Sequence, residues 1–306
     1  MDHVRPARQT DPTARREDTM AVRTNPTLHQ RRLGAELRRM REQAGLGGGQ
    51  LAKMLGISPG QMTQMETAKI GVSPERLRTV AAACNCANRP LIDALAEMAS
   101  DRRKGWWDEY REALTTDFLE VAELEGRAAR LNVCTTTYMP GLLQTGAYAS
   151  AVFARVVPPL PPQDLELRTT FRLKRQQLIR SGRTPLQAFI HEAALRMRFG
   201  GPQVLAEQLD ALIEDSERPG ISVRVVPFAL DTFPGSGENL TYAEGPVSEL
   251  DTIQMDVSQG ALFFDSPADL AKHRAIFSRL DSTALSEQGS RDFIRSIMKE
   301  ARAANA

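Results

Sequence analysis

The chain has 306 residues, of which 42% are hydrophobic, and this size and composition suit two packed domains. Its formal net charge is only +1, but the charge is unevenly distributed: residues 29–90 carry ten Lys or Arg and four Glu, whereas residues 91–306 carry a net charge of −6. A basic segment joined to an acidic one suggests nucleic acid as the partner of the first and a different partner for the second.

The composition excludes two broad classes, disulfide-stabilised secreted proteins and proteins that span a membrane. The three cysteines are an odd number and provide no disulfide framework, and no apolar run approaches the roughly 20 residues that span a bilayer. The first residues include arginines but no apolar segment, so they do not resemble a secretory signal. We therefore expect a cytoplasmic, nucleoid-associated protein that does not bind membranes.

The pattern of the sequence divides the chain into three parts. Residues 1–27 are polar, rich in Arg, Thr and Pro and without periodicity, which predicts a disordered tail. Residues 28–100 have helical periodicity, and residues 105–302 mix helical and strand patterns after the basic linker 102–104. We expect a mainly α domain of five helices followed by an α+β domain.

Start and stop signals define the five helices of the first domain. Gly45 and Gly56 end the first and second helices. Ser58 and Ser73 are each an N-cap followed by proline at the first helical position, and Asn88 opens the fifth helix. The predicted helices cover residues 28–44, 50–55, 59–66, 74–83 and 89 up to the linker.

The second and third of these helices have the features of a pair that crosses closely and binds DNA. Ala52 is the small residue needed where two such helices cross, and Gly56 supplies the sharp turn between them. Apolar residues at 51, 55, 57, 62 and 65 would hold the pair on a core, and the third helix would present polar side chains outward.

Residues 33–46 (LGAELRRMREQAGL) and 51–58 (LAKMLGIS) resemble the Xre/Cro helix-turn-helix family. The resemblance implies that the third helix enters the major groove. Two segments depart from the family pattern. Glycines at 47–49 replace a Ser cap and a phosphate-binding Gln, so we expect the second helix to be frayed in the free protein. Pro59 and Gly60 occupy positions where relatives often place base-reading side chains.

The DNA contacts divide into bases and phosphates. Gln61 and Gln64 are the main candidates for reading bases, because glutamine pairs well with adenine N6 and N7, and phosphate contacts are assigned to basic side chains. The predicted DNA-binding residues are Gln50, Ser58, Gln61, Thr63, Gln64, Lys69, Arg38, Arg41 and Lys53. Such domains bind pseudo-palindromic sites in pairs, so the expected partners are double-stranded DNA and a second copy of the chain as a homodimer.

The second domain is predicted to contain several short strands among its helices. Periodicity predicts a long amphipathic helix over residues 108–129 and further helices over 148–155, 163–181, 203–217, 267–280 and 290–301. Strands are predicted at residues 131–137, 186–190, 221–226, 240–242, 252–257 and 261–264. This mixture is typical of an α+β domain.

Several blocks of the second domain resemble a domain of unknown function found in actinobacterial Xre-type regulators. The blocks lie at residues 107–110, 123–128, 139–149, 175–178, 191–196, 200–201, 208–209, 223–228 and 284–290. The resemblance implies antitoxin-like regulators that act with small proteins encoded nearby. The Pro140-Gly141 turn before two leucines suits either a hinge or cleft, or a turn packed on the core.

Three functions remain open on this reading. The chain is a transcriptional regulator whose second domain binds a small protein or effector, an antitoxin-like sequestering protein with autoregulatory DNA binding, or a small-molecule sensor. We do not expect an enzyme, a cofactor or a metal, and we assign no catalytic residue. His191-Glu192 resembles the start of a zinc-protease motif, but Leu195 stands where the second His would be required.

Overall fold

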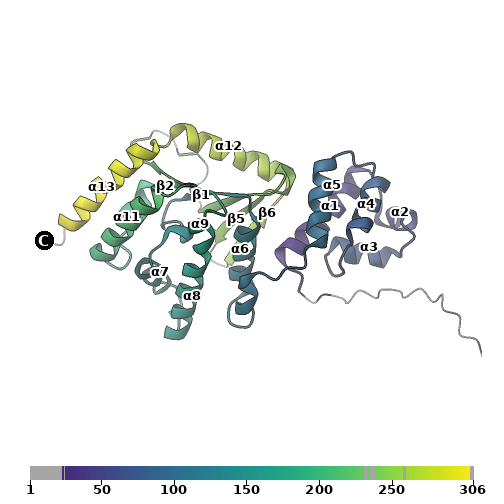
Figure 1. Cartoon of the computed structure of the whole chain (residues 1–306), viewed down its shortest axis with the longest axis horizontal. Coiled ribbons are helices and arrows are strands. Elements are labelled where there is room, and N and C mark those ends of the chain that lie inside the picture. The colour runs from purple at the N-terminus through teal and green to yellow at the C-terminus, as the bar shows by residue number, and fades with distance from the viewer. Residues whose placement is uncertain are drawn as a thin grey trace, which may run out of the picture. The chain divides into compact units, whose positions relative to one another are not determined.

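The computed structural model of the chain describes residues 23, 25–230, 233–234, 237, 239–257 and 260–303 (Figure 1). The chain forms two compact units, one within residues 1–87 and one within residues 88–306. Most of the tail predicted over residues 1–27 lies outside the described residues. Its last residue, Thr27, is the N-cap of the first helix.

The first unit contains α1 (Leu28–Gln43), α2 (Gly48–Met54), α3 (Pro59–Glu66) and α4 (Pro74–Ala83). Side-chain caps explain three of the four helix starts. Oxygens of Thr27, Ser58 and Ser73 each accept a hydrogen bond from the backbone N–H three residues later. The fifth predicted helix is α5 (Arg89–Ser100), which belongs to the second compact unit and is capped by Asn88. All five predicted helices are confirmed.

The core of the first unit is made by one face of each helix. Leu37, Leu51, Met62 and Leu77 are at most 1% exposed, so each contributes its full apolar surface. Helix α1 also comes very close to the end of α3, because a Cβ atom added to Gly34 would lie 2.5 Å from the Glu66 carbonyl oxygen. Only glycine allows this approach.

The second unit is built on a six-stranded mixed sheet with the strand order β3-β2-β1-β4-β5-β6. Strands β1, β2 and β3 pair in parallel, and the other neighbours pair antiparallel. The strands are β1 (Arg130–Thr135), β2 (Leu186–His191), β3 (Ile221–Val226), β4 (Leu240–Glu244), β5 (Thr252–Val257) and β6 (Gly260–Phe264). All six predicted strands are therefore present, and the α+β class is confirmed.

Helices cover both faces of this sheet (Figure 1). On one face, alternate strand residues such as Val133 and Ile190 pack with α7, α9, α11 and α13. On the other face, the intervening residues, such as Cys134 and Phe189, pack with α12. The helices are α6 (Thr116–Arg127), α7 (Gly146–Phe153), α8 (Pro162–Arg175), α9 (Gln177–Arg180), α10 (Glu192–Arg196), α11 (Pro202–Ser216), α12 (Pro267–Thr283) and α13 (Glu287–Ala303).

The long helix predicted over residues 108–129 is wrong in its first part. A short 3-10 helix, η1 (Trp106–Tyr110), comes first, and α6 begins only at Thr116. The reason is tertiary packing: the ring of Trp106 lies 5.1 Å from the Phe171 ring, which draws this segment onto α8. Among the described residues, no helix is both long enough and apolar enough to cross a bilayer.

Candidate nucleic-acid interface

Helices α2 and α3 are joined by the sharp turn that the sequence predicts. Gly56 has a φ of +65°, a conformation that suits glycine, and the Ile57 N–H donates to the Ala52 carbonyl at 3.0 Å. Ala52 itself is fully buried. The turn therefore fixes the direction in which α3 leaves α2.

A reciprocal pair of hydrogen bonds holds the start of α3. The Gln61 backbone N–H donates to Ser58 Oγ at 3.1 Å, and the Ser58 N–H donates to Gln61 Oε1 at 3.0 Å. Both residues are exposed, as predicted for DNA contacts. Bidentate recognition of adenine needs Oε1 of glutamine as an acceptor, and in Gln61 that atom already accepts from Ser58, which fixes the amide and leaves one lone pair.

The next turn of α3 presents Thr63 and Gln64. Thr63 is exposed, and its hydroxyl donates to the Pro59 carbonyl at 3.1 Å, so its methyl group and the lone pairs of its hydroxyl oxygen are left for a base. Gln64 is half-buried, and its side-chain amide makes no hydrogen bond to any residue that the structure describes. Of the predicted base-reading residues, Gln64 therefore keeps a complete donor and acceptor pair.

Helix α2 begins at Gly48, two residues earlier than predicted. The reason is Gln50, whose Oε1 accepts a hydrogen bond from the Gly47 N–H at 2.7 Å. This bond satisfies one of the open N–H groups that a Ser cap would not reach. Fraying of this helix start in the free protein stays a prediction, and Gln50, exposed as predicted, retains its amide nitrogen for a phosphate.

Three of the four predicted phosphate-binding cations lie at the surface. Lys53 on α2 and Lys69 after α3 are exposed. The side chain of Arg38 is 63% exposed and forms a hydrogen-bonded pair with Glu42 at 2.7 Å. Such exposed pairs are weak, so DNA can compete for the Arg38 guanidinium.

Arg41 has different surroundings. Its Nε and one terminal nitrogen donate to both carboxylate oxygens of Glu66, at 2.6 and 3.0 Å, and its other terminal nitrogen donates to the Leu46 carbonyl at 3.0 Å. The two charged side chains are 12% and 11% exposed. All three nitrogens are therefore engaged inside the unit, and this geometry favours a structural role for Arg41 over a phosphate contact.

Two residues at this surface were not predicted. Thr67 follows α3 and is exposed, with its hydroxyl donating to the Thr63 carbonyl at 2.8 Å. Met54, at the end of α2, is 57% exposed although the other methionines of this motif, Met62 and Met65, are core residues. The one sequence signal for this exposure is the helical period, because Met54 does not lie on the face of α2 that Leu51 and Leu55 share.

In the second unit, His191 and Glu192 do not pair with each other. His191 ends β2 and caps α10, where its Nδ1 accepts from the Ala193 N–H at 3.2 Å. Glu192 is buried and accepts from Arg196 at 2.7 Å and from the Phe228 N–H at 2.9 Å. Among the described residues, no group of three His, Cys, Asp or Glu side chains could hold a metal ion.

The Pro140-Gly141 segment packs onto the core of the second unit. Three buried glutamine side chains hold this loop: Gln144, Gln176 and Gln208 each donate an amide hydrogen to a carbonyl oxygen between residues 139 and 144. Buried amides with this many partners fix a loop in one conformation. Of the two readings left open, the packed turn is therefore the one that the contacts favour.

A half-buried cation, Arg172, lies beside the same loop. Arg172 donates to Gln144 Oε1 at 2.7 Å and its guanidinium lies 4.3 Å from the centre of the Phe153 ring. Burial and the neighbouring Arg175 lower the pKa of Arg172 to about 10. Arg175 itself is paired with Glu125 by two hydrogen bonds, at 2.8 and 2.6 Å.

Comparison with known protein families gives two matches. Residues 32–95 match a helix-turn-helix domain, which supports a DNA-binding regulator. Neither a curated protein nor a solved structure matches the chain. Residues 118–296, more than half of the chain, match the family described as a domain of unknown function, DUF5753. The chain therefore belongs to the DUF5753 family and carries a helix-turn-helix domain before it.

Proposed function

We propose that the protein is a sequence-specific transcriptional regulator of the Xre/Cro type that reads DNA with the exposed face of α3. The observation that carries this proposal is a set of four polar side chains, Ser58, Gln61, Thr63 and Gln64, none of them buried, on a helix and its N-cap held to a buried core. The surrounding segment, residues 29–90, has a net charge of +6, which suits a polyanion.

These four residues have different roles in this proposal. Gln64 reads a base, because its side-chain amide has both its donor and its acceptor free of other described residues. Ser58 and Gln61 mainly hold the start of the helix in place. Lys53, Lys69 and Arg38 bind phosphates and supply affinity without sequence information. Gln50 donates its amide nitrogen to a phosphate while its oxygen caps α2.

We further propose that the regulator acts as a homodimer on a pseudo-palindromic site. A single helix-turn-helix reads only a few base pairs, so such domains gain affinity and specificity by pairing on two half-sites about one helical turn apart. Size-exclusion chromatography with light scattering on the full chain, with and without the operator, tests this stoichiometry. A single chain bound to each operator would contradict it.

The second unit supplies the regulatory input and acts without catalysis. Two occupants are proposed for it, an effector or a small protein encoded nearby, and the net charge of −6 over residues 91–306 favours a basic partner in the second case. In the antitoxin-like version of this function, sequestering that partner is the main task and DNA binding regulates the chain's own expression. Co-expression with the adjacent small gene and purification at a fixed stoichiometry would support that version.

The DNA-binding proposal is tested by selecting an operator from a random duplex library with the purified full chain, and then measuring anisotropy at several salt concentrations. Gln64→Ala should weaken specific binding by about 1–3 kcal/mol, roughly 5- to 150-fold, without changing the salt slope. Lys53→Gln should weaken binding to every sequence and reduce the salt slope by about 1. Gln43→Ala, an exposed glutamine on α1, is the matched control and should bind like the wild type. Equal binding by Gln64→Ala and wild type would refute the assignment of Gln64.

A further inference from the structure

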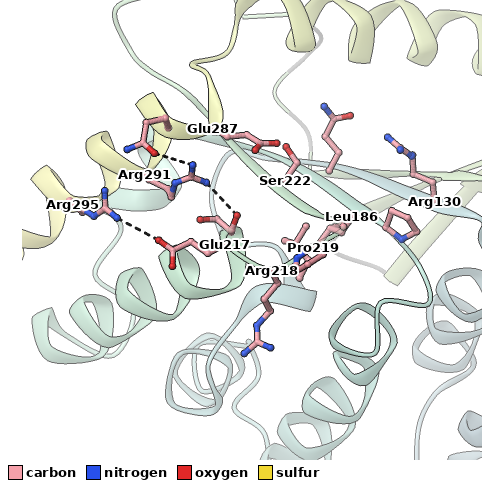
Figure 2. Close-up of a pocket in the computed structure, with 15 residues that line it drawn as sticks. Arg130, Leu186, Glu217, Arg218, Pro219, Ser222, Glu287, Arg291 and Arg295 are labelled. Atoms are coloured by element: carbon pink, nitrogen blue, oxygen red, sulfur yellow. Dashed lines mark hydrogen bonds and ion pairs between the residues drawn. The ribbon is translucent and has the colours of Figure 1, made fainter.

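The second unit has a groove of about 740 Å³ at the edge of the sheet where β1, β2 and β3 begin (Figure 2). Apolar atoms of Pro185, Leu186, Pro219 and Ile221 line part of it, and the end of α11 and the first turns of α13 form its other sides. Its volume lies within the range of about 300–1,000 Å³ that is typical of sites for small molecules.

Charged side chains from three separate segments line this groove. It is lined by four arginines, Arg130, Arg218, Arg291 and Arg295, and by two acids, Glu217 and Glu287. The lining residues alone have an excess of two positive charges, but Asp215 and Asp292, which pair with two of the arginines, balance it. The attraction of this groove for anions therefore rests on the arginines that no carboxylate pairs with.

Two of the four arginines are held by carboxylates. Arg218 donates to Asp215 at 2.9 Å, and it points away from Arg291 and Arg295 (Figure 2). Arg295 donates to Asp292 at 2.9 Å, with Glu217 at 3.7 Å on its other side. We therefore leave both Arg218 and Arg295 out of the proposed site.

The other two arginines have no carboxylate within 4.0 Å among the described residues. Arg291, which is half-buried, donates only to neutral acceptors: the Ser216 carbonyl at 3.4 Å and Gln288 Oε1 at 3.0 Å. These bonds orient its guanidinium without neutralising it. The exposed side chain of Arg130 makes no hydrogen bond or ion pair to the described residues, and it lies across the groove from Arg291 and Arg295 (Figure 2).

We propose that this groove binds a small molecule with an anionic group at each end, either phosphates or carboxylates. Arg291 binds one group, and Arg130 binds the other, since the planar guanidinium suits both kinds of anion. The proposal rests on the effector version of the proposed function and names the class of effector. The apolar residues at the strand starts contact the part of the ligand between its two charges.

Glu287 allows a test in which two substitutions on the same helix change the affinity for an anion in opposite directions. It lines the same groove, no hydrogen bond or ion pair joins its side chain to the described residues, and Figure 2 shows it between Arg291 and Ser222. Its carboxylate repels an anion bound to Arg291. Removing the charge at Glu287 should therefore tighten binding, whereas removing the charge at Arg291, on the same helix, should weaken it.

The experiment is calorimetric titration of the full chain at low salt with three probes. Fructose 1,6-bisphosphate and suberate each carry an anionic group at both ends and distinguish phosphates from carboxylates, and inorganic phosphate carries a single group. We expect Arg291→Gln to weaken binding of all probes that bind by about 10-fold or more, and Glu287→Gln to tighten it by a few-fold. Arg130→Gln should weaken only the two-ended probes. Arg198→Gln, an exposed arginine outside the groove, is the control.

The outcomes are distinct. Failure of both two-ended probes to bind the wild type would overturn the proposal, and so would equal effects of Arg291→Gln and Arg198→Gln, because the attraction would then be diffuse. Arg291→Lys, which keeps the charge, should retain part of the affinity if Arg291→Gln proves unstable. DNA binding of every variant is measured without probe: normal DNA binding with no anion binding refutes only the groove, and absent DNA binding refutes only the proposed regulator.

Discussion

Replacing Arg41 tests whether this residue has a structural role or contacts DNA. The sequence predicts a phosphate contact for it, whereas the structure places its guanidinium inside the first unit. The bidentate pair between Arg41 and Glu66 joins α1 to the end of α3, and both side chains are nearly buried. In Arg41→Met the side chain keeps a similar length and apolar stem, but the Glu66 carboxylate and the Leu46 carbonyl lose their donor. The substitution therefore tests one ion pair with little change in volume.

The size of the effect follows from burial. Removing one partner of a buried pair costs about 3–5 kcal/mol, because the remaining charge is left without compensation. The residual exposure of 12% and 11% lets water reach Glu66 in part, so we expect the lower end, about 3 kcal/mol. The double substitution Arg41→Met with Glu66→Met removes both charges and should recover most of this loss.

The assay combines urea unfolding followed by circular dichroism with DNA binding at several salt concentrations. If Arg41 is structural, Arg41→Met lowers the unfolding midpoint, and DNA binding measured well below that midpoint keeps the wild-type salt slope. If Arg41 contacts a phosphate, the slope falls by about 1 while the midpoint changes little. The second result, or a double variant no more stable than the single one, would refute the reasoning.

Three further predictions concern stability. Gly34→Ala should destabilise the first unit by about 1–3 kcal/mol in urea titrations, because its Cβ would meet the Glu66 carbonyl at 2.5 Å; unchanged stability would show that α1 can shift freely. Arg175→Met should cost about 3–5 kcal/mol by leaving Glu125 unpaired, whereas Lys174→Met, whose partner Glu109 is 70% exposed, should cost less than about 1; similar losses for the two would contradict the role of burial. Burial lowers the pKa of His191, and the charge of Glu192 offsets this shift only in part. Because the unfolded chain then binds a proton more tightly than the folded one, stability should fall as the pH drops below about 6.5. His191→Asn, which can still cap α10, should flatten this pH dependence between pH 7.5 and 5.5, and an unchanged slope would exclude His191 as its source.

Local signals in the sequence predicted most helix and strand positions. Ser58 and Ser73, each followed by proline, mark helix starts by chemistry that involves only neighbouring residues, so no distant contact can change it. The strand at 221–226 is correct to the residue because alternating apolar side chains end at Pro227. The parallel pairing of β1, β2 and β3 could not be read from these patterns, because it depends on crossover helices that meet the sheet only in three dimensions.

Both the residues of the candidate site and their division into base and phosphate contacts were predicted, but the intramolecular partners of Arg41 and Gln61 were not. Exposure of Lys53, Gln61 and Thr63 follows from the helical period. The helical period places Arg41 nearer the apolar face of α1 than Arg38, but it does not indicate the pairing of Arg41 with Glu66, which spans 25 residues of sequence. The long helix predicted from residue 108 failed for the same reason, since the contact of Trp106 with Phe171 is distant in sequence.

The hydrogen bond between Gly47 and Gln50 restricts which substitutions this surface can accept during evolution. Because the Gln50 side chain accepts from the N–H of residue 47, its replacement leaves that N–H open whichever residue stands at 47. Gly47→Ser would add a hydroxyl that accepts from the N–H of residue 50, a different group, and so would complete a capping box without replacing the existing bond. A serine acquired at 47 therefore stabilises this helix start but leaves position 50 as constrained as before.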